Sequence, residues 1–254
     1  RLDWGKALVR TGRAEEALAS FEKARTLAAA ASDRPRYADA LAGLGWVEWV
    51  LRRPQAEAHI LGSLDAARVL GDRQRESAAL TLLGGLRADE RRWHEAEVHS
   101  REALAIASQG AHAQRLAEAR LGLVRLLLVQ RRLPEADELL ALSHSELPGR
   151  RHWTDREINA CSAIACAMAG RVEEARGRLR VIESTSGDSN AEGRRLLAWR
   201  AVVALAAARE DGDGDEAIAL ARRALAVEVT ALPGHPFALR VLAGELAEYE
   251  AGRS

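Results

Sequence analysis

One short phrase recurs six times along the chain at almost constant spacing, and it constrains the fold more than any other feature. Each copy contains Glu-Ala or Gln-Ala, and successive alanines are 39, 40, 40, 39 and 42 residues apart. The alanines are Ala17, Ala56, Ala96, Ala136, Ala175 and Ala217. A near-constant period between about 20 and 50 residues is the signature of a solenoid, in which each repeat stacks on its neighbours.

The residues around each alanine indicate the start of a helix. Acidic residues or proline stand just before it, as in Glu15-Glu16 and Pro134-Glu135. Both are favourable in a first helical turn. Acidic side chains interact with the positive end of the helix dipole, and the backbone N–H that proline lacks would have no partner within the helix there. Arginine stands four residues before five of the alanines, and we assign it to the end of the preceding helix, whose dipole favours cations. Gly12, Gly170 and Gly212 supply the open backbone of a turn. Each phrase is therefore predicted to be a helix–turn–helix corner.

A second small residue follows each alanine by seven positions, on the same helix face. These residues are Ala24, Ser63, Ala103, Ser143, Ile182 and Ala224. Two small side chains on one face allow a neighbouring helix to approach closely, and Ile182 predicts that the fifth repeat packs differently. No long segment alternates with period two, so we expect no strands.

The coarse prediction is an all-α solenoid of about six helical hairpins followed by a capping helix. The expected helix pairs are 2–11/14–31, 35–52/54–70, 73–89/93–108, 112–130/134–146, 154–169/172–185 and 190–209/214–229, with the cap at 236–250. The cap carries Glu245, Glu248 and Glu250 and would close the open end of the array. Any bend is expected at 146–154.

The third repeat carries the clearest family resemblance. It contains Leu83-Gly84, Trp93, Glu95-Ala96 and Ala103-Leu104, and the first repeat matches through Gly5, Gly12, Glu16-Ala17, Phe21 and Ala24. This pattern resembles the tetratricopeptide repeat family. The period near 40 exceeds the usual length of about 34 residues. The long variant resembles the repeat sensor regions of large bacterial nucleotide-binding regulators, the MalT-like proteins.

The resemblance implies a right-handed superhelix that forms one domain over 1–254. The repeats would span approximately 1–34, 35–72, 73–111, 112–153, 154–189 and 190–235, with the cap at 236–254. Because the chain starts at Arg1 and enters a helical pattern at once, we expect it to be a piece of a longer protein.

The composition narrows the possible partners and compartment. Acidic and basic residues balance at 37 each, which removes the simplest argument for direct nucleic-acid binding. Cys161 and Cys166 read as small buried thiols in a reducing compartment. No apolar run reaches the roughly 18–20 residues of a membrane span, and no signal peptide is visible. We therefore expect a cytoplasmic protein without a membrane partner.

Motifs for catalysis, metals or cofactors are not visible. The seven histidines are scattered, without a His-Glu-x-x-His spacing. The stretch 211–216 resembles the start of a calcium loop, but Arg222 occupies the position where a bidentate glutamate is required. We expect no cofactor, no metal and no enzymatic activity.

The tryptophans suggest where a partner would bind. Trp46 and Trp49 are three apart and share a helix face. They either pack against neighbouring helices or form an aromatic platform, since exposed tryptophan and arginine often anchor interfaces. In the tetratricopeptide register both would line the inner groove, together with Lys6, Arg10, Asp89 and Arg125.

Two hypotheses for function follow. The first is a non-catalytic scaffold that binds a partner protein or peptide on the concave face of the superhelix. The alternative is a ligand-sensing regulatory domain of a larger bacterial signalling protein, such as a MalT-like transcription regulator or a Ser/Thr kinase. The identity of the partner and the oligomeric state stay open.

Overall fold

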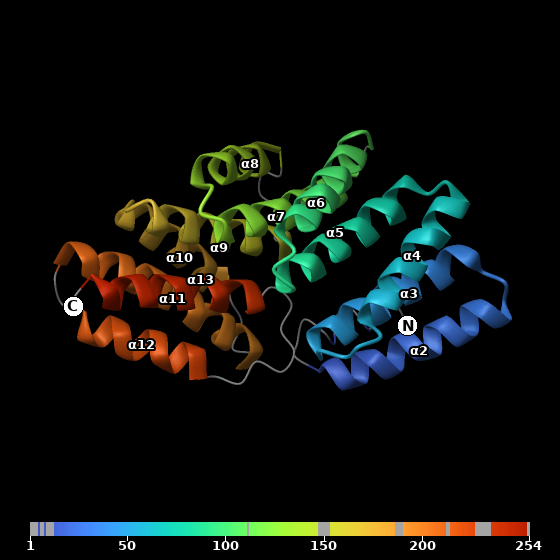
Figure 1. Cartoon of the computed structure of the whole chain (residues 1–254), viewed down its shortest axis with the longest axis horizontal. Helices are drawn as coiled ribbons and strands as arrows, with labels where there is room; N and C mark the ends of the chain where they lie inside the picture. The colour runs from blue at the N-terminus through green and yellow to red at the C-terminus, as the bar shows by residue number, and fades with distance from the viewer. Residues whose placement is uncertain are drawn as a thin grey trace. The chain divides into compact units, whose positions relative to one another are not determined.

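A computed structural model describes Gly5, Leu8 and residues 13–110, 112–146, 153–185, 190–211, 214–226 and 235–252. Over these residues all regular structure is helical, as predicted, and no strand occurs. The helices in Figure 1 are α2 (Ala14–Ala30), α3 (Arg34–Val50), α4 (Ala56–Leu70), α5 (Arg73–Asp89), α6 (Trp93–Ser108), α7 (Ala113–Val129), α8 (Leu133–Glu146), α9 (Trp153–Met168), α10 (Val172–Thr185), α11 (Asn190–Asp211), α12 (Asp215–Ala226) and α13 (His235–Ala251).

The observed helix ends lie close to the predicted ones. The helices expected at 73–89, 93–108 and 172–185 coincide with α5, α6 and α10. Helix α4 begins two residues later than expected, and Pro54 lies in the turn that precedes it. Of the helix expected at 2–11, only Gly5 and Leu8 are described, and both are helical. Most of the connection at 146–154, where a bend was expected, lies outside the described residues.

The repeated corner works differently from the prediction in one respect. The carbonyl groups of Arg13, Arg92 and Arg132 accept the first helical hydrogen bonds, from the alanine N–H groups four residues on, at 3.0, 3.0 and 3.2 Å. The N–H groups of the same arginines donate to the carbonyls of Leu8, Arg87 and Leu127 at 2.9 Å, so each arginine begins the following helix while its own backbone also closes the preceding one. Their guanidinium groups pair forward with the glutamate three residues later, for example Arg13 Nε with Glu16 Oε1 at 2.6 Å. The Arg13 hydrogen bond lowers the pKa of that carboxyl below its usual value.

The tightest point of the corner needs left-handed backbone. Gly170 has φ +76° there, as expected for a glycine. At the matching corners Arg52, Arg91 and Arg131 adopt φ values of +54°, +60° and +58°. A side chain in this region is disfavoured by about 1–2 kcal/mol. Gly12 and Gly212, which were predicted to serve the same purpose, lie outside the described residues.

The six repeat alanines are buried, which confirms the close crossings that the spacing predicted. Their exposed fractions are 0, 3, 0, 0, 0 and 6% in chain order. The small residues seven positions later are buried as well. Among them, Ser63 Oγ donates a hydrogen bond to the Ala38 carbonyl at 2.9 Å. Ile182 is only 1% exposed, so the larger side chain is accommodated inside the fifth repeat.

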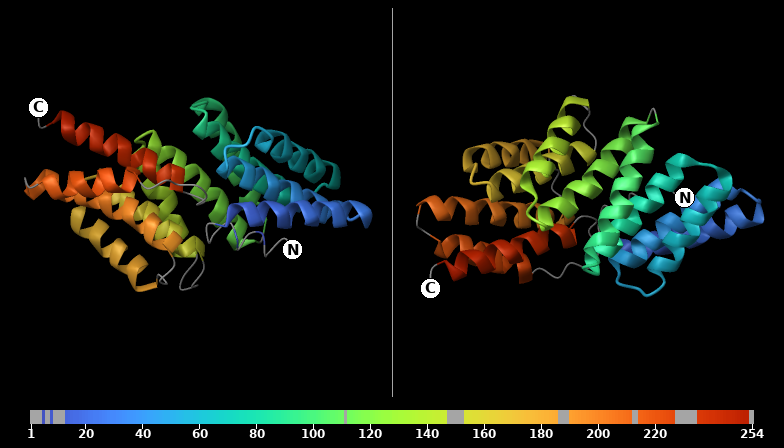
Figure 2. Two further views of the ribbon diagram at one scale, coloured as in Figure 1. Left: turned by 90° about the horizontal axis from the view of Figure 1, so that it is seen from below. Right: turned by 45° about the horizontal axis from the view of Figure 1, so that its top comes forward.

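The chain divides into two compact units. Unit 1 comprises residues 1–126 with 230–233, and unit 2 comprises 127–229 with 234–254. In unit 1, consecutive helices from α2 to α6 pack against one another, and in unit 2 α9 packs against α8, α10 and α11 (Figure 2). This sequential stacking of helical hairpins is an α-solenoid. Helix α13 packs against α11 and α12, as expected for a C-terminal cap.

Two further sequence predictions concern burial and membranes. Cys161 and Cys166 are buried free thiols, as predicted. None of the helices over the described residues has both the length and the apolar character that a membrane crossing requires.

Candidate partner-binding site

The strongest contact among the predicted site residues joins Trp49 and Asp89. Trp49 lies near the end of α3 and Asp89 ends α5, one repeat further along the chain. The indole Nε1 donates to Asp89 Oδ2 at 2.7 Å, and both residues are partly buried. A hydrogen bond to a carboxylate is stronger than one between neutral groups. The pair therefore links the first helices of two consecutive hairpins.

Gly85 makes this contact sterically possible. A Cβ added there would lie 2.4 Å from Cη2 of Trp49, so the indole ring occupies the space of the missing side chain. The neighbouring Gly84 faces the other way, towards Ser100 of α6. Sequence reasoning did not single out Gly85, although the double glycine after Leu83 was the available signal. One glycine admits the partner helix of its own hairpin and the next admits the tryptophan of the preceding hairpin.

Trp46 and Trp49 serve different neighbours although they share a helix face. Trp46 packs against the cluster that contains Leu8, Phe21 and Leu44. Trp49 packs against the next cluster, built from α4 to α7. Each indole ring is therefore partly buried against its own cluster. Only the exposed part of the ring is accessible to a partner.

The other predicted site residues are less completely placed. Arg125 lies on α7, the first helix of the following hairpin, and is partly buried. Lys6 and Arg10 lie outside the described residues. The structure thus brings Trp49 and Asp89 into contact and places Arg125 one hairpin further along.

A buried arginine next to the site was not predicted. The side chain of Arg87 is 7% exposed and bonds to Glu90 at 2.9 Å and, more closely, to Glu57 of α4. These carboxylates raise the pKa of Arg87, and the hydrogen bond from Arg87 lowers the pKa of Glu57. Because the partners come from α4 and the end of α5, this cluster holds the helices that present Asp89. No local sequence signal separates Arg87 from the many exposed arginines.

A small cavity lies at the opposite end of α5. Its volume is about 200 Å³, and Arg73, Ile106, His112 and Arg115 line it. Arg73 and Arg115 already pair with Glu76 and Glu118. Their charges are thus largely neutralised, and the cavity gives no strong reason to expect an anionic ligand.

One side-chain pair resembles part of a catalytic arrangement. His144 Nε2 and Ser162 Oγ are 3.0 Å apart, and burial lowers the pKa of His144 below its ordinary value. Ser162 is only 5% exposed, so this hydroxyl is poorly placed to meet a substrate. The pair instead ties α8 to α9. Within the described ranges, no group of three His, Cys, Asp or Glu side chains is arranged to hold a metal ion.

Comparison with known proteins supports the fold. No protein-family model matches the chain, and no curated protein matches it either. Among solved structures, it resembles Rap protein in the crystal structure of that protein complexed with competence and sporulation factor. The TM-score is 0.67 at 15% sequence identity, over 96% of this chain and 63% of Rap. The chain thus spans less than two thirds of the length of that neighbour, and the likeness establishes an α-solenoid of tetratricopeptide-like hairpins.

Proposed function

We propose that the chain is a non-catalytic scaffold that binds a segment of a partner protein on the face of unit 1 formed by α3, α5 and α7. The observation that carries the proposal is the Trp49–Asp89 contact between successive first helices. Stacked hairpins present equivalent positions in a row, which suits an extended segment of another protein. The likeness to Rap supports it, because that neighbour was crystallised with a bound factor.

The chemistry of the face suggests how the segment is held. Asp89 and Arg125 offer one charge of each sign, and the indoles of Trp46 and Trp49 offer apolar area. Aromatic and arginine side chains contribute disproportionately to binding at such surfaces. A partner segment with apolar residues and mixed charge would match it.

Variants that preserve the fold test the proposal. Asp89→Asn keeps an acceptor for the Trp49 indole but removes the charge, and Arg125→Gln removes the opposite charge. Glu102→Gln on α6 is the control, since this side chain is 43% exposed on a second helix of its hairpin. The immobilised chain would capture partners from a lysate, and their affinities for each variant would then be measured by titration.

The expected result is at least about a tenfold loss of affinity, or 1.4 kcal/mol, in one or both site variants and none in the control. A partner that binds all three variants as tightly as the unmodified chain would show that this face is not the binding surface.

A second candidate is a ligand-sensing region of a larger bacterial signalling protein. The favouring observation is the repeat period of 39–42 residues, which resembles the MalT-like variant. In that case a small ligand would change the oligomeric state of the full-length protein. Light scattering with and without the bound ligand distinguishes this candidate from a passive scaffold.

A further inference from the structure

Helix α13 buries a carboxylate in the middle of an apolar stripe. Phe237, Val241, Leu242, Leu246 and Tyr249 face the interior of unit 2, with exposed fractions of 7% or less. Glu245 lies on the same stripe and is 2% exposed. A buried carboxylate is expensive unless it is paired and hydrogen-bonded, so its partners determine what can occupy this position.

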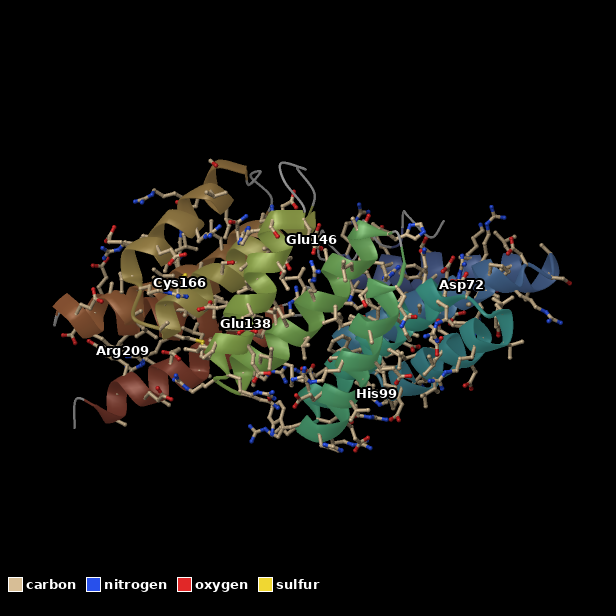
Figure 3. The ribbon with its side chains drawn as sticks, turned by 90° about the horizontal axis from the view of Figure 1, so that it is seen from above. Asp72, His99, Glu138, Glu146, Cys166 and Arg209 are labelled. Atoms are coloured by element: carbon tan, nitrogen blue, oxygen red, sulfur yellow. The ribbon has the colours of Figure 1, made fainter. Side chains whose placement is uncertain are left out.

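Two arginines from different hairpins hold Glu245. Arg131, in the corner after α7, donates to Oε1 at 2.8 Å, and Arg209, near the end of α11, donates to Oε2 at 2.7 Å. Arg209 also donates to the Glu245 carbonyl at 3.3 Å. Figure 3 labels Arg209, whose side chain comes from the α11 ribbon and meets α13. Each oxygen of the carboxylate therefore has its own guanidinium.

Glu248, one helical turn later, extends the same arrangement. It contacts Arg131 closely and lies 3.9 Å from the Arg209 guanidinium. Two carboxylates three residues apart thus face two arginines. The acids of the cap, which were expected to sit on a terminal helix without a specified partner, point towards earlier parts of the chain.

The arginines and the carboxylate differ in their access to solvent. The side chains of Arg131 and Arg209 are 41% and 34% exposed, whereas Glu245 has 3% of its side chain exposed. Another carboxylate can therefore reach the guanidinium groups while α13 is still in place. Removal of one partner from a buried ion pair is strongly destabilising, so an incoming carboxylate that keeps both arginines paired avoids that cost.

We propose that Arg131 and Arg209 form a docking site for an acidic amphipathic helix of a partner protein, and that α13 is a built-in competitor for that site. The partner helix carries two carboxylates three residues apart, with apolar residues on the same face, because that is the pattern of α13 itself. This surface lies in unit 2 and is separate from the Trp49–Asp89 face, so either proposal can fail alone.

A defined peptide tests the proposal on the full chain. The probe is a fluorescein-labelled, amidated peptide with the sequence of residues 235–252, and its binding is followed by fluorescence anisotropy. In the chain, Glu245→Gln together with Glu248→Gln weakens the internal competitor but keeps both arginines. Because an occupied site reduces apparent affinity in proportion to the free fraction, this double variant should bind the probe at least about tenfold tighter than the unmodified chain.

Three controls make the result specific. Glu250→Gln removes the outlying pair with Arg222 and should leave probe binding unchanged. A probe with glutamine in place of both glutamates should bind the double variant at least about tenfold more weakly, a difference of 1.4 kcal/mol. Addition of Arg131→Gln and Arg209→Gln to the double variant should abolish the gain.

Several outcomes would overturn the proposal. One is a double variant that binds the probe no better than Glu250→Gln, and another is equal binding of the glutamine probe. If the double variant forms a dimer on size-exclusion chromatography, the occupant is the α13 of a second copy and the partner helix is rejected. Circular dichroism checks folding, and if the double variant unfolds, Glu248→Gln alone should still give a gain of a few fold, because that side chain is 55% exposed and its loss is milder.

Discussion

Replacing Gly45 by alanine should destabilise unit 1 although alanine is the better helix former. A Cβ at this position would lie 2.5 Å from Cγ1 of Ile60 and 3.0 Å from both the Ala56 carbonyl oxygen and the Ile60 nitrogen. Ile60 is fully buried, and the other two atoms belong to the backbone of α4, so the helices themselves must separate. Overpacking of this kind costs about 1–3 kcal/mol. Because backbone atoms must move, the overpacking cost lies in the upper part of that range, and the gain in helix propensity is about 1 kcal/mol, so the expected net loss is about 1–2 kcal/mol.

Urea denaturation followed by tryptophan fluorescence measures this loss, because Trp46 and Trp49 follow the substituted position within four residues on the same helix. The transition midpoint should fall without a change in slope, since the surface exposed on unfolding is the same. Gly244→Ala is the matched control: it lies within α13, and no atom is within 4 Å of an added Cβ. It should stabilise the chain by about 0.5–1 kcal/mol. A Gly45→Ala chain that is as stable as the unmodified one, or more so, would refute the close approach of α3 and α4.

Three further predictions concern the corner, the site and pH. Arg91→Gly should stabilise the folded chain by about 0.5–1 kcal/mol and Gly170→Ala should destabilise it by about 1 kcal/mol, because both positions have positive φ. Thermal melts in which Gly170→Ala is the more stable variant would contradict these backbone conformations. Trp49→Phe should cost about 1–2 kcal/mol in chemical denaturation, because it leaves the Asp89 carboxylate without its indole donor, whereas Asp89→Asn should cost less. The folded-state pKa of His144 is depressed, so the stability linked to this group is present above about pH 6.5 and is lost as pH falls through the folded pKa. His144→Gln should therefore reduce the fall in midpoint between pH 7 and pH 5.5, and an unchanged pH dependence would count against this assignment.

The predictions that held rest on local signals repeated many times. Six alanines at an almost constant interval established the hairpin array, and the acids and prolines beside them located the helix starts. Each of these effects operates within one turn of helix or one corner, so no knowledge of distant residues is needed. The six buried alanines confirm this reasoning.

The assignment of the corner arginines to the preceding helix was incomplete, because two local effects operate at that position. An arginine that follows a helix can interact with the negative end of the dipole of that helix, or its guanidinium group can pair with an acidic side chain in the next helix. In Arg13 and Arg92 the forward pair with Glu16 and Glu95 is the one observed. The spacing of three residues between arginine and glutamate was visible in the sequence and would have pointed to this result.

The contacts among the candidate site residues could be predicted only in part. The repeat register placed Trp49 and Asp89 on the same face, and the structure brings them into contact. The register did not reveal that Trp46 and Trp49 pack on different clusters, because that depends on the cluster around Phe21 in one case and on the space beside Gly85 in the other. The register predicts which residues share a helix face. The packing of neighbouring hairpins determines how much of each indole ring remains exposed to solvent.

The sequence by itself determined the all-helical class, the hairpin period and the alanine crossings. These features depend on the spacing of small residues and on the acids and prolines at helix starts, which are residues close together in the sequence. Only the tertiary structure decided how buried charges are paired. Arg131 and Glu245 are 114 residues apart, and Arg209 completes their arrangement from a third part of the chain. Any of the many arginines could have satisfied Glu245 as far as composition is concerned. The stacking of the hairpins of unit 2 selected these two, since it alone determines which guanidinium groups reach the buried carboxylate.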